Sequence, residues 1–305
     1  MADRNTELPR AGTRQLPFQE SIGDGSRLQP LPGKPSIGTR DWVRGKFYAL
    51  RTLAEMMRWF DNWRAVFDGY RGRTPLPPLR FRRGFVLRHR PCDEPVATCR
   101  EVFRDRSYRR FVHESSAGVM IDLGANIGVV TLDWATRLKG VTIHSYEPHP
   151  ATLAMLAANI SENRLAQRVR IYNEAVSRTP GTLVLRTFWC SVLTSAYAEP
   201  AEADGNNESC SVRVPAVSLD EVIARCAGQG PVNLVKMDVE GAEADILEGA
   251  SQSTLKKIGQ FVIEYHDNLC TQARARCERV LVAAGFRCRA RQLFERQGLL
   301  YAIRE

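Results

Sequence analysis

Two hydrophobic periods alternate along most of the chain and predict its secondary structure. From Val119 onward, short runs rich in β-branched residues alternate with segments in which apolar residues recur every three or four positions. The short runs predict buried strands, and the longer segments predict helices. The predicted strands are Val119–Leu123, Val141–Tyr146, Val169–Tyr172, Val232–Met237 and Gln260–Glu264. The predicted helices are Val129–Leu138, Pro150–Asn163, Leu219–Ala227 and Ala242–Gly249.

The last predicted elements break this alternation. A helix from Cys270 to Ala284 stops at Gly285, and two strands, Phe286–Arg291 and Leu299–Ile303, follow without a helix between them. Strands joined by so short a connection can pair only in the antiparallel direction. The sequence therefore predicts an α/β fold whose mostly parallel sheet, covered by helices on both faces, ends in an antiparallel hairpin. A nicotinamide-binding Rossmann sheet would continue in parallel strands.

The region before the sheet divides into a tail and an extension. Residues 1–40 contain many prolines and glycines and no hydrophobic period, which predicts a disordered tail. Residues 41–112 form a predicted extension, in which a short hairpin spans Leu79–Leu87 and a helix spans Val96–Phe111. Residues 113–305 form the predicted catalytic domain.

The extension opens with a predicted amphipathic helix that starts at Trp42 and ends before Gly69. Apolar residues recur at helical spacing along it, with arginines between them. Such a stripe most often packs on a core or on a partner helix, and its tryptophan and arginine content would also suit peripheral contact with a membrane. The stripe consists of Val43, Phe47, Leu50, Ala54, Met57, Phe60 and Trp63.

Composition and charge narrow the class of protein. The 305 residues are 44% hydrophobic, but no apolar run approaches the roughly 20 residues of a membrane span, and no apolar signal segment opens the chain. We therefore expect a cytoplasmic protein.

Residues 1–110 contain 23 Lys and Arg against 12 Asp and Glu, whereas residues 111–305 contain 20 against 22. The basic third could contact nucleic acid, anionic lipid or a phosphorylated substrate, or form only a solvated surface.

The most specific local motif lies where the first predicted strand meets the first helix. It runs from Asp122 through Gly124, Ala125 and Asn126 to Gly128. The glycines and the asparagine allow positive φ and let a ligand lie against the main chain. The spacing does not fit the dinucleotide fingerprint G-x-G-x-x-G. It resembles the acidic glycine motif of S-adenosylmethionine enzymes, with Asn126 in place of the middle glycine.

Further acids follow the next two strands. Glu147 and Pro148 end the second strand, where a carboxylate of a nucleotide-binding sheet accepts hydrogen bonds from ribose hydroxyls. Glu174 and Ala175 follow the third strand, where a carboxylate would accept a hydrogen bond from an adenine amino group. Because ligands of open α/β sheets bind outside the carboxyl ends of the strands, we expect these residues to line one crevice.

The fourth and fifth strands provide the candidate catalytic residues. Asp238 and Glu240 follow the fourth strand, and Glu264 and His266 end the fifth. Histidine is the usual base at neutral pH, so His266 is the candidate base, with Asp238 and Glu240 orienting the acceptor or the cofactor. A divalent ion held by Asp238, Glu240 and Glu264 is an alternative. Glu243 is interpreted as a charge at a helix N-terminus.

The order and spacing of these segments resemble the FkbM family of S-adenosylmethionine-dependent methyltransferases. The resemblance lies in V-M-I-D-L-G-A-N-I-G from Val119, Y-E-P-H-P from Tyr146, N-E-A-V-S from Asn173, V-P-A-V-S-L-D from Val214, V-K-M-D-V-E-G-A-E from Val235 and I-E-Y-H from Ile263. A weaker similarity extends upstream through F-D-N-W from Phe60 and E-V-F-R-D-R-S-Y from Glu101.

The resemblance implies a Rossmann-like class I methyltransferase fold, S-adenosyl-L-methionine as cofactor, and transfer to a hydroxyl of a sugar, a glycolipid or another small natural product. In such an enzyme Asp122 and the Gly124–Gly128 loop would hold the methionine part, Glu147 the ribose, and Glu174 with Ala175 the adenine. The resemblance does not identify the acceptor, because residues 188–211 depart from the serine-rich acceptor loop of the family.

Two alternatives stay open. The first is a nucleic-acid methyltransferase that would use the basic N-terminal region. The fourth strand argues against it, because it ends in D-V-E-G and not in the D/N-P-P-Y/F motif typical of enzymes that methylate base amines. The second alternative is a non-catalytic module that only binds the cofactor. The complete set of predicted site residues argues against this alternative.

Overall fold

The computed structural model describes residues 39–188, 190–195, 210–226 and 228–304. The predicted disordered tail lies outside the described residues, apart from residues 39 and 40. The chain divides into two compact units, Met1–Phe47 and Tyr48–Glu305. The sheet and the candidate site belong to the second unit.

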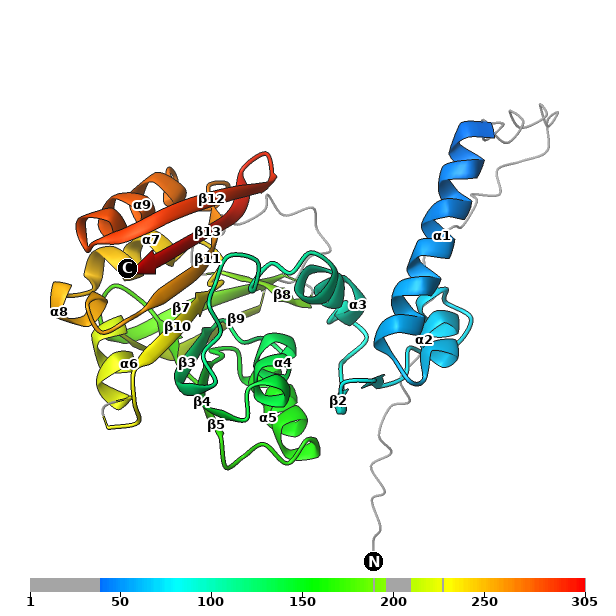
Figure 1. The fold of residues 1–305 in the computed structure, drawn as a ribbon, viewed down its shortest axis with the longest axis horizontal. Helices are drawn as coiled ribbons and strands as arrows, with labels where there is room; N and C mark the ends of the chain where they lie inside the picture. The colour runs from blue at the N-terminus through cyan, green and yellow to red at the C-terminus, as the bar shows by residue number, and fades with distance from the viewer. Residues whose placement is uncertain (1–38, 189, 196–209, 227, 305) are drawn as a thin grey trace, which may run out of the picture. The chain divides into compact units, whose positions relative to one another are not determined.

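Seven strands form the central sheet of this unit (Figure 1). In sheet order they are β12 (Phe286–Phe294), β13 (Gln297–Arg304), β11 (Gln260–His266), β10 (Val232–Met237), β3 (Ala117–Leu123), β4 (Gly140–Tyr146) and β5 (Val169–Tyr172). The strands from β11 to β5 are parallel, whereas β13 is antiparallel to both β11 and β12. The predicted parallel sheet with a closing antiparallel hairpin is therefore confirmed.

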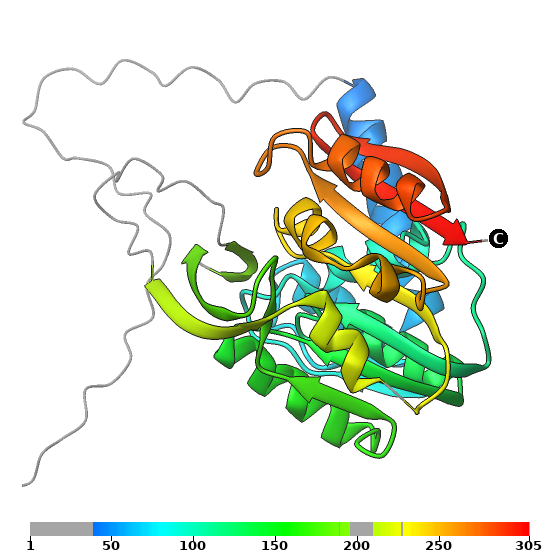
Figure 2. The ribbon, with the colours of Figure 1, turned by 90° about the vertical axis from the view of Figure 1, so that its left-hand side faces the viewer.

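Helices cover both faces of this sheet, as the sequence predicts. Alternate residues of a strand point to opposite faces, so Met120 of β3 belongs to one hydrophobic cluster and its neighbours Val119 and Ile121 belong to another. Helices α4 (Val129–Arg137) and α5 (Pro150–Glu162) contribute to the first cluster. The second includes α6 (Leu219–Arg225), α7 (Glu243–Gly249), α8 (Gln252–Leu255) and α9 (Ala273–Ala283). Figures 1 and 2 show α9 (orange) and α5 (green) on opposite sides of the sheet.

A second sheet, which the sequence did not predict, follows β5. Its order is β6 (Ala175–Val176), β9 (Cys210–Val217), β7 (Gly181–Phe188) and β8 (Cys190–Ser195). β7 is antiparallel to β8 and β9, and β6 is parallel to β9. Among the described residues, its own buried apolar cluster consists of Ala175, Leu185, Val214 and Ala216, whereas Val176 and Val217 pack into a cluster of the central sheet. So small a core leaves only a weak alternation in the sequence.

The extension begins with two helices where the sequence predicted one. Helix α1 spans Thr39–Trp59 and α2 spans Trp63–Tyr70. Between them, Phe60 forms an isolated β-bridge with Phe81, which interrupts the helix. The predicted hairpin is confirmed as β1 (Leu79–Phe81) and β2 (Phe85–Leu87).

The predicted helix over Val96–Phe111 is too long. Helix α3 (Pro95–Cys99) continues as a π-helical turn, η1 (Arg100–Arg104), and the chain then leaves the helix. Arg106 has a φ of 52°, a left-handed conformation that a right-handed helix does not contain. This bend carries the following residues toward the carboxyl ends of β10 and β11, where Tyr108 meets Asp238 and Glu264.

The packing interpretation of the first helix is wrong for its middle part. Leu50, Ala54 and Met57 of the predicted stripe are exposed, whereas Met56 and Trp59, outside that stripe, are buried. The helix carries apolar residues on two sides, and their spacing alone does not show which side meets the core.

Among the described residues, no helix has the length and apolar content needed to cross a membrane.

Candidate active site

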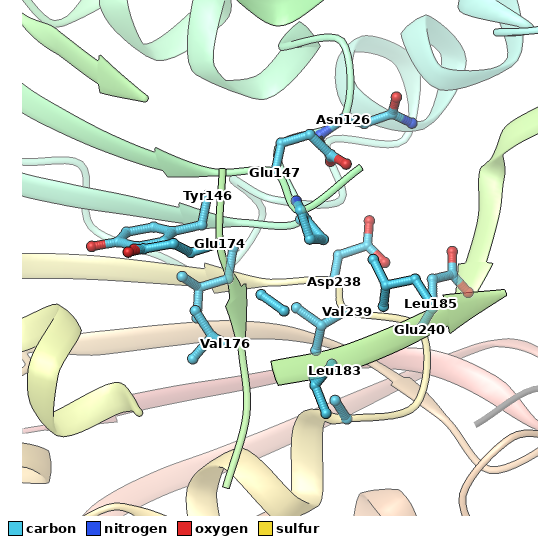
Figure 3. A pocket seen from close by; sticks show the side chains of 15 residues that line it. Asn126, Tyr146, Glu147, Glu174, Val176, Leu183, Leu185, Asp238, Val239 and Glu240 are labelled. Carbon is cyan, nitrogen blue, oxygen red and sulfur yellow. Dashed lines mark hydrogen bonds between the residues drawn. The ribbon is translucent and has the colours of Figure 1, made fainter. Parts of the chain in front are cut away.

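A pocket opens at the carboxyl ends of β3, β4 and β10 (Figure 3). The pocket holds about 740 Å³ of space between atoms, part of which is open to solvent. The second sheet contributes Val176, Leu183 and Leu185 to the wall. The predicted site residues that line the pocket are Gly124, Asn126, Glu147, Pro148, Glu174, Ala175, Asp238 and Glu240. Asp122, Ala125, Gly128 and His266 lie outside this lining.

The turn between β3 and α4 depends on left-handed backbone conformations. Gly124 and Gly128 have φ values of 74° and 97°, and Asn126 has a φ of 50°. A Cβ atom added to Gly124 would collide with the carbonyl oxygen of Asp238. Glycine therefore lets the turn pack directly against the end of β10, which brings the main chain of the motif to the pocket.

Glu147 connects the end of β4 with this turn. Its Oε2 accepts a hydrogen bond from the backbone N–H of Asn126, and its Oε1 accepts one from that of His149, both at 2.9 Å. The side chain lines the pocket although the residue is only 7% exposed. Burial raises the pKa of Glu147 to about 7, and the two backbone hydrogen bonds oppose this rise.

Asp122 lies beneath the turn in a buried ion pair. Its Oδ1 is 3.2 Å from Nζ of Lys236, and its Oδ2 accepts a hydrogen bond from Thr131 Oγ1 at 2.7 Å. Lys236 Nζ also donates to the carbonyl oxygen of Gly124 at 2.7 Å and lies 3.5 Å from Asp238 Oδ2. Burial alone would lower the pKa of Lys236, but these carboxylates raise it above its ordinary value. Lys236, to which the sequence analysis gave no role, thus links the turn to Asp238.

Glu174 also lines the pocket. Its carboxylate forms a bidentate pair with the guanidinium of Arg225, whose Nη2 lies 3.1 Å from Oε1. Arg225 in turn lies over the ring of Tyr172, with Cζ 5.3 Å from the ring centroid. Glu174 is therefore held in place by α6 and the end of β5, next to Ala175 at the start of the second sheet.

His266 is buried and ion-paired behind the pocket. Its Nδ1 donates to Oε1 of Glu243 at 2.8 Å, and its Nε2 lies 3.5 Å from Oε2 of Glu240. Burial alone would lower the pKa of His266, but the hydrogen bond to Glu243 and the nearby carboxylates raise it to about 10. Glu243 is fully buried, so it is more than a surface charge at the start of α7. These contacts hold the imidazole in its protonated form at neutral pH, which argues against a role as the free base.

Glu240 brings a carboxyl group to the pocket wall. Its backbone φ of 50° is unusual for a glutamate and turns the chain between β10 and α7. Burial raises the pKa of Glu240 to about 8, and the charge of Asp238 adds to this rise, whereas His266 opposes it. Glu240 is thus a carboxyl group that exchanges its proton near neutral pH.

The extension contributes two residues that the sequence analysis did not assign. Tyr108, 3% exposed, donates its hydroxyl hydrogen to Oε2 of Glu264 at 2.9 Å and lies 3.3 Å from Oδ2 of Asp238. Burial and the charge of Asp238 raise the pKa of Glu101, whose Oε1 is buried without a hydrogen-bond partner. The upstream similarity E-V-F-R-D-R-S-Y begins at Glu101 and ends at Tyr108, so this segment was the signal for both residues.

Within the part of the chain that the structure describes, one group of side chains has metal-ligand spacing. Asp238, Glu240 and His266 each offer a donor atom, and these three atoms lie within 4.8 Å of one another. Glu264, which the sequence analysis placed in the alternative metal set, instead accepts the hydrogen bond of Tyr108. The ion pair between His266 and Glu240 explains the same proximity without a metal, so metal binding stays an alternative.

The fold and the site together define the class of protein. A parallel sheet closed by an antiparallel β13, the glycine-containing turn after β3 and the acid after β4 are features of Rossmann-like class I methyltransferases. The family model for the methyltransferase FkbM domain matches residues 122–288. The chain therefore belongs to the FkbM family of S-adenosylmethionine-dependent methyltransferases.

Known relatives share this domain. The chain is 31% identical over 214 residues to the 31-O-demethyl-FK506 methyltransferase FkbM of Streptomyces tacrolimicus. This match covers 62% of this chain and 81% of the relative. It is 29% identical over 185 residues to methyltransferase 1 of Beauveria bassiana, covering 55% and 72%. It is 26% identical over 155 residues to the hexuronic acid methyltransferase AglP of Haloferax volcanii, covering 48% and 56%.

Proposed function

We propose that this enzyme methylates a hydroxyl group of a small molecule, a sugar or a glycolipid, with S-adenosyl-L-methionine as methyl donor. The observation that carries the proposal is one pocket with two chemically different walls. Glu147, with Gly124 and Asn126 of the turn after β3, forms one wall, and Asp238 with Glu240 forms another. The names of two relatives, an O-demethyl-FK506 methyltransferase and a hexuronic acid methyltransferase, support this acceptor class.

The first wall fits the cofactor. We assign the ribose to Glu147, whose carboxylate reaches the pocket and has lone pairs beyond those used by the two backbone N–H groups. Glu174 and Ala175 would hold the adenine, and the main chain of the Gly124–Gly128 turn would hold the methionine part. Asp122 would act indirectly, because Lys236 connects it to the carbonyl oxygen of Gly124.

The second wall would orient the acceptor and take its proton. When bound, the cofactor supplies a methyl group already activated by the sulfonium charge, so the protein must mainly align the acceptor oxygen and accept its proton. We assign the proton acceptor to Glu240 in place of His266, because Glu240 lines the pocket and His266 lies behind it. His266 would hold the Glu240 carboxylate in place, and Asp238 would orient the hydroxyl.

Transfer of a labelled methyl group tests the proposal. The purified protein is incubated with methyl-labelled S-adenosylmethionine and separate fractions of sugars, lipids and RNA, and the label is located by mass spectrometry. Label on an oxygen of a small molecule or glycolipid is the expected result. Label in RNA, or on nitrogen, would contradict the acceptor class. Binding of S-adenosylhomocysteine without transfer to any fraction would instead support a non-catalytic module.

A further inference from the structure

Helix α1 exposes an apolar face to solvent. Leu50, Ala54 and Met57 stand at i, i+4 and i+7 on one side of the helix, and Leu50 and Met57 are 65% and 45% exposed. On the other side, Met56 is fully buried and Trp59 is 9% exposed. The face with Met56 and Trp59 therefore packs in the core of the second unit. The face with Leu50, Ala54 and Met57 is not covered by any described residue.

Positive charge borders the exposed face. Arg51 and Arg58 follow Leu50 and Met57 directly in the sequence and are both exposed. The acid of this part of the helix, Glu55, lies on the inner side, where its Oε2 accepts a hydrogen bond from Nε of Arg100 at 2.9 Å. Arg51 also lies 3.4 Å from Glu55, and even so its side chain is 61% exposed. Between positions 50 and 58, the exposed side is thus apolar and cationic.

We infer that this face of α1 binds the surface of an anionic membrane. Apolar side chains beside arginines let a helix lie in the headgroup region, where the apolar groups leave water and the guanidinium groups meet phosphate or carboxylate. A second copy of this chain is the less suitable partner. Two-fold pairing through this face would bring Arg51 and Arg58 near their own copies, and the one acid beside them, Glu55, is already hydrogen-bonded to Arg100.

Vesicle sedimentation tests this inference without requiring methyl transfer. The protein of residues 1–305 is mixed with vesicles of phosphatidylcholine alone or with about 30% phosphatidylserine. We expect binding to the anionic vesicles only, reduced at least about tenfold when salt rises from about 0.05 to 0.5 M, because salt screens exposed charges. The double variant Leu50→Asp, Met57→Asp should lose this binding.

A matched variant separates the face from general surface hydrophobicity. Val282 of α9 is 59% exposed, so Val282→Asp makes the same chemical change at a comparable position on another helix and should leave binding intact. Equal binding to neutral vesicles, or no binding to either, would overturn the inference. So would a dimer in solution that the Leu50→Asp, Met57→Asp variant dissociates, because the face would then belong to a second copy. Circular dichroism of each variant checks that the fold is retained.

Discussion

The raised pKa of Glu147 predicts that cofactor affinity depends on pH. Burial favours the neutral carboxyl group and raises its pKa to about 7, whereas ribose hydroxyls donate hydrogen bonds and favour the carboxylate. Binding should therefore remove the proton. If only the ionised form binds, affinity should be about tenfold weaker at pH 6 than at pH 8, because about nine tenths of Glu147 is protonated at the lower pH and about a tenth at the higher.

Isothermal titration calorimetry with S-adenosylhomocysteine measures this effect directly. At pH 6, in two buffers of different ionisation enthalpy, the difference in observed heat should correspond to the release of about 0.9 proton per bound ligand. The Glu147→Gln variant removes charge-assisted hydrogen bonds of about 1.5–3 kcal/mol, so its affinity at pH 8 should be about ten- to hundredfold lower. That variant should also lose the dependence on pH.

Glu174→Gln is the matched control, since Glu174 lines the same pocket but pairs with Arg225. It should keep the tenfold difference between pH 6 and pH 8, whatever its effect on absolute affinity. A flat profile in the wild-type protein, or a tenfold slope that survives in Glu147→Gln, would refute the assignment of Glu147 to the ribose.

Three further predictions test the other residues of the site. Glu240→Gln should lower kcat about 10²- to 10⁴-fold with little change in cofactor affinity. The wild-type rate should level off near pH 8, the pKa of Glu240. A wild-type rate that still rises toward pH 10 would restore His266 as the base. Tyr108→Phe removes the hydrogen bond to Glu264 and should lower kcat about tenfold at unchanged cofactor affinity. A fall in kcat that is accompanied by a lower melting temperature and weaker cofactor binding would instead mark Tyr108 as structural. Gly124→Ala should lower the free energy of unfolding in urea by about 1–3 kcal/mol more than Gly84→Ala, because both glycines have positive φ but only at Gly124 would the new Cβ collide with backbone; equal losses would contradict this reasoning.

The sequence predicted the inner strands of the central sheet well because they are largely buried on both faces. A strand of this kind is a mostly apolar run that stops abruptly, as in β10, which has the predicted bounds. The edge strand β5 has the predicted bounds too, although only Val169 in it is buried. The second sheet has no such runs. Most positions of β7 between Gly181 and Arg186 are not buried, so polar and apolar residues mix there without a clear period. The same ambiguity explains α1, in which two apolar sides share one helical spacing.

Distance along the chain separates the predicted part of the site from the part that was missed. Glu147 follows the glycine turn at the next strand end, so local motifs and strand order were enough to place it. Tyr108 reaches Asp238 and Glu264 across 130 and 156 positions of sequence. No local spacing encodes that contact, because it depends on the bend at Arg106 and on how the extension packs against the sheet.

The ion pair between Asp122 and Lys236 shows what strand order adds to motifs. Each residue stands one position before the end of its strand, and the parallel register of β3 and β10 places Lys236 directly beside Asp122. Once β3 and β10 are neighbours, a buried acid and a buried base at equal height must lie on the same face of the sheet, where each reduces the cost of burying the other. The acid of the D-L-G-A-N-I-G motif therefore has a structural partner inside the protein. Its effect on the cofactor would pass through Lys236 to the carbonyl group of Gly124, and not through a direct contact.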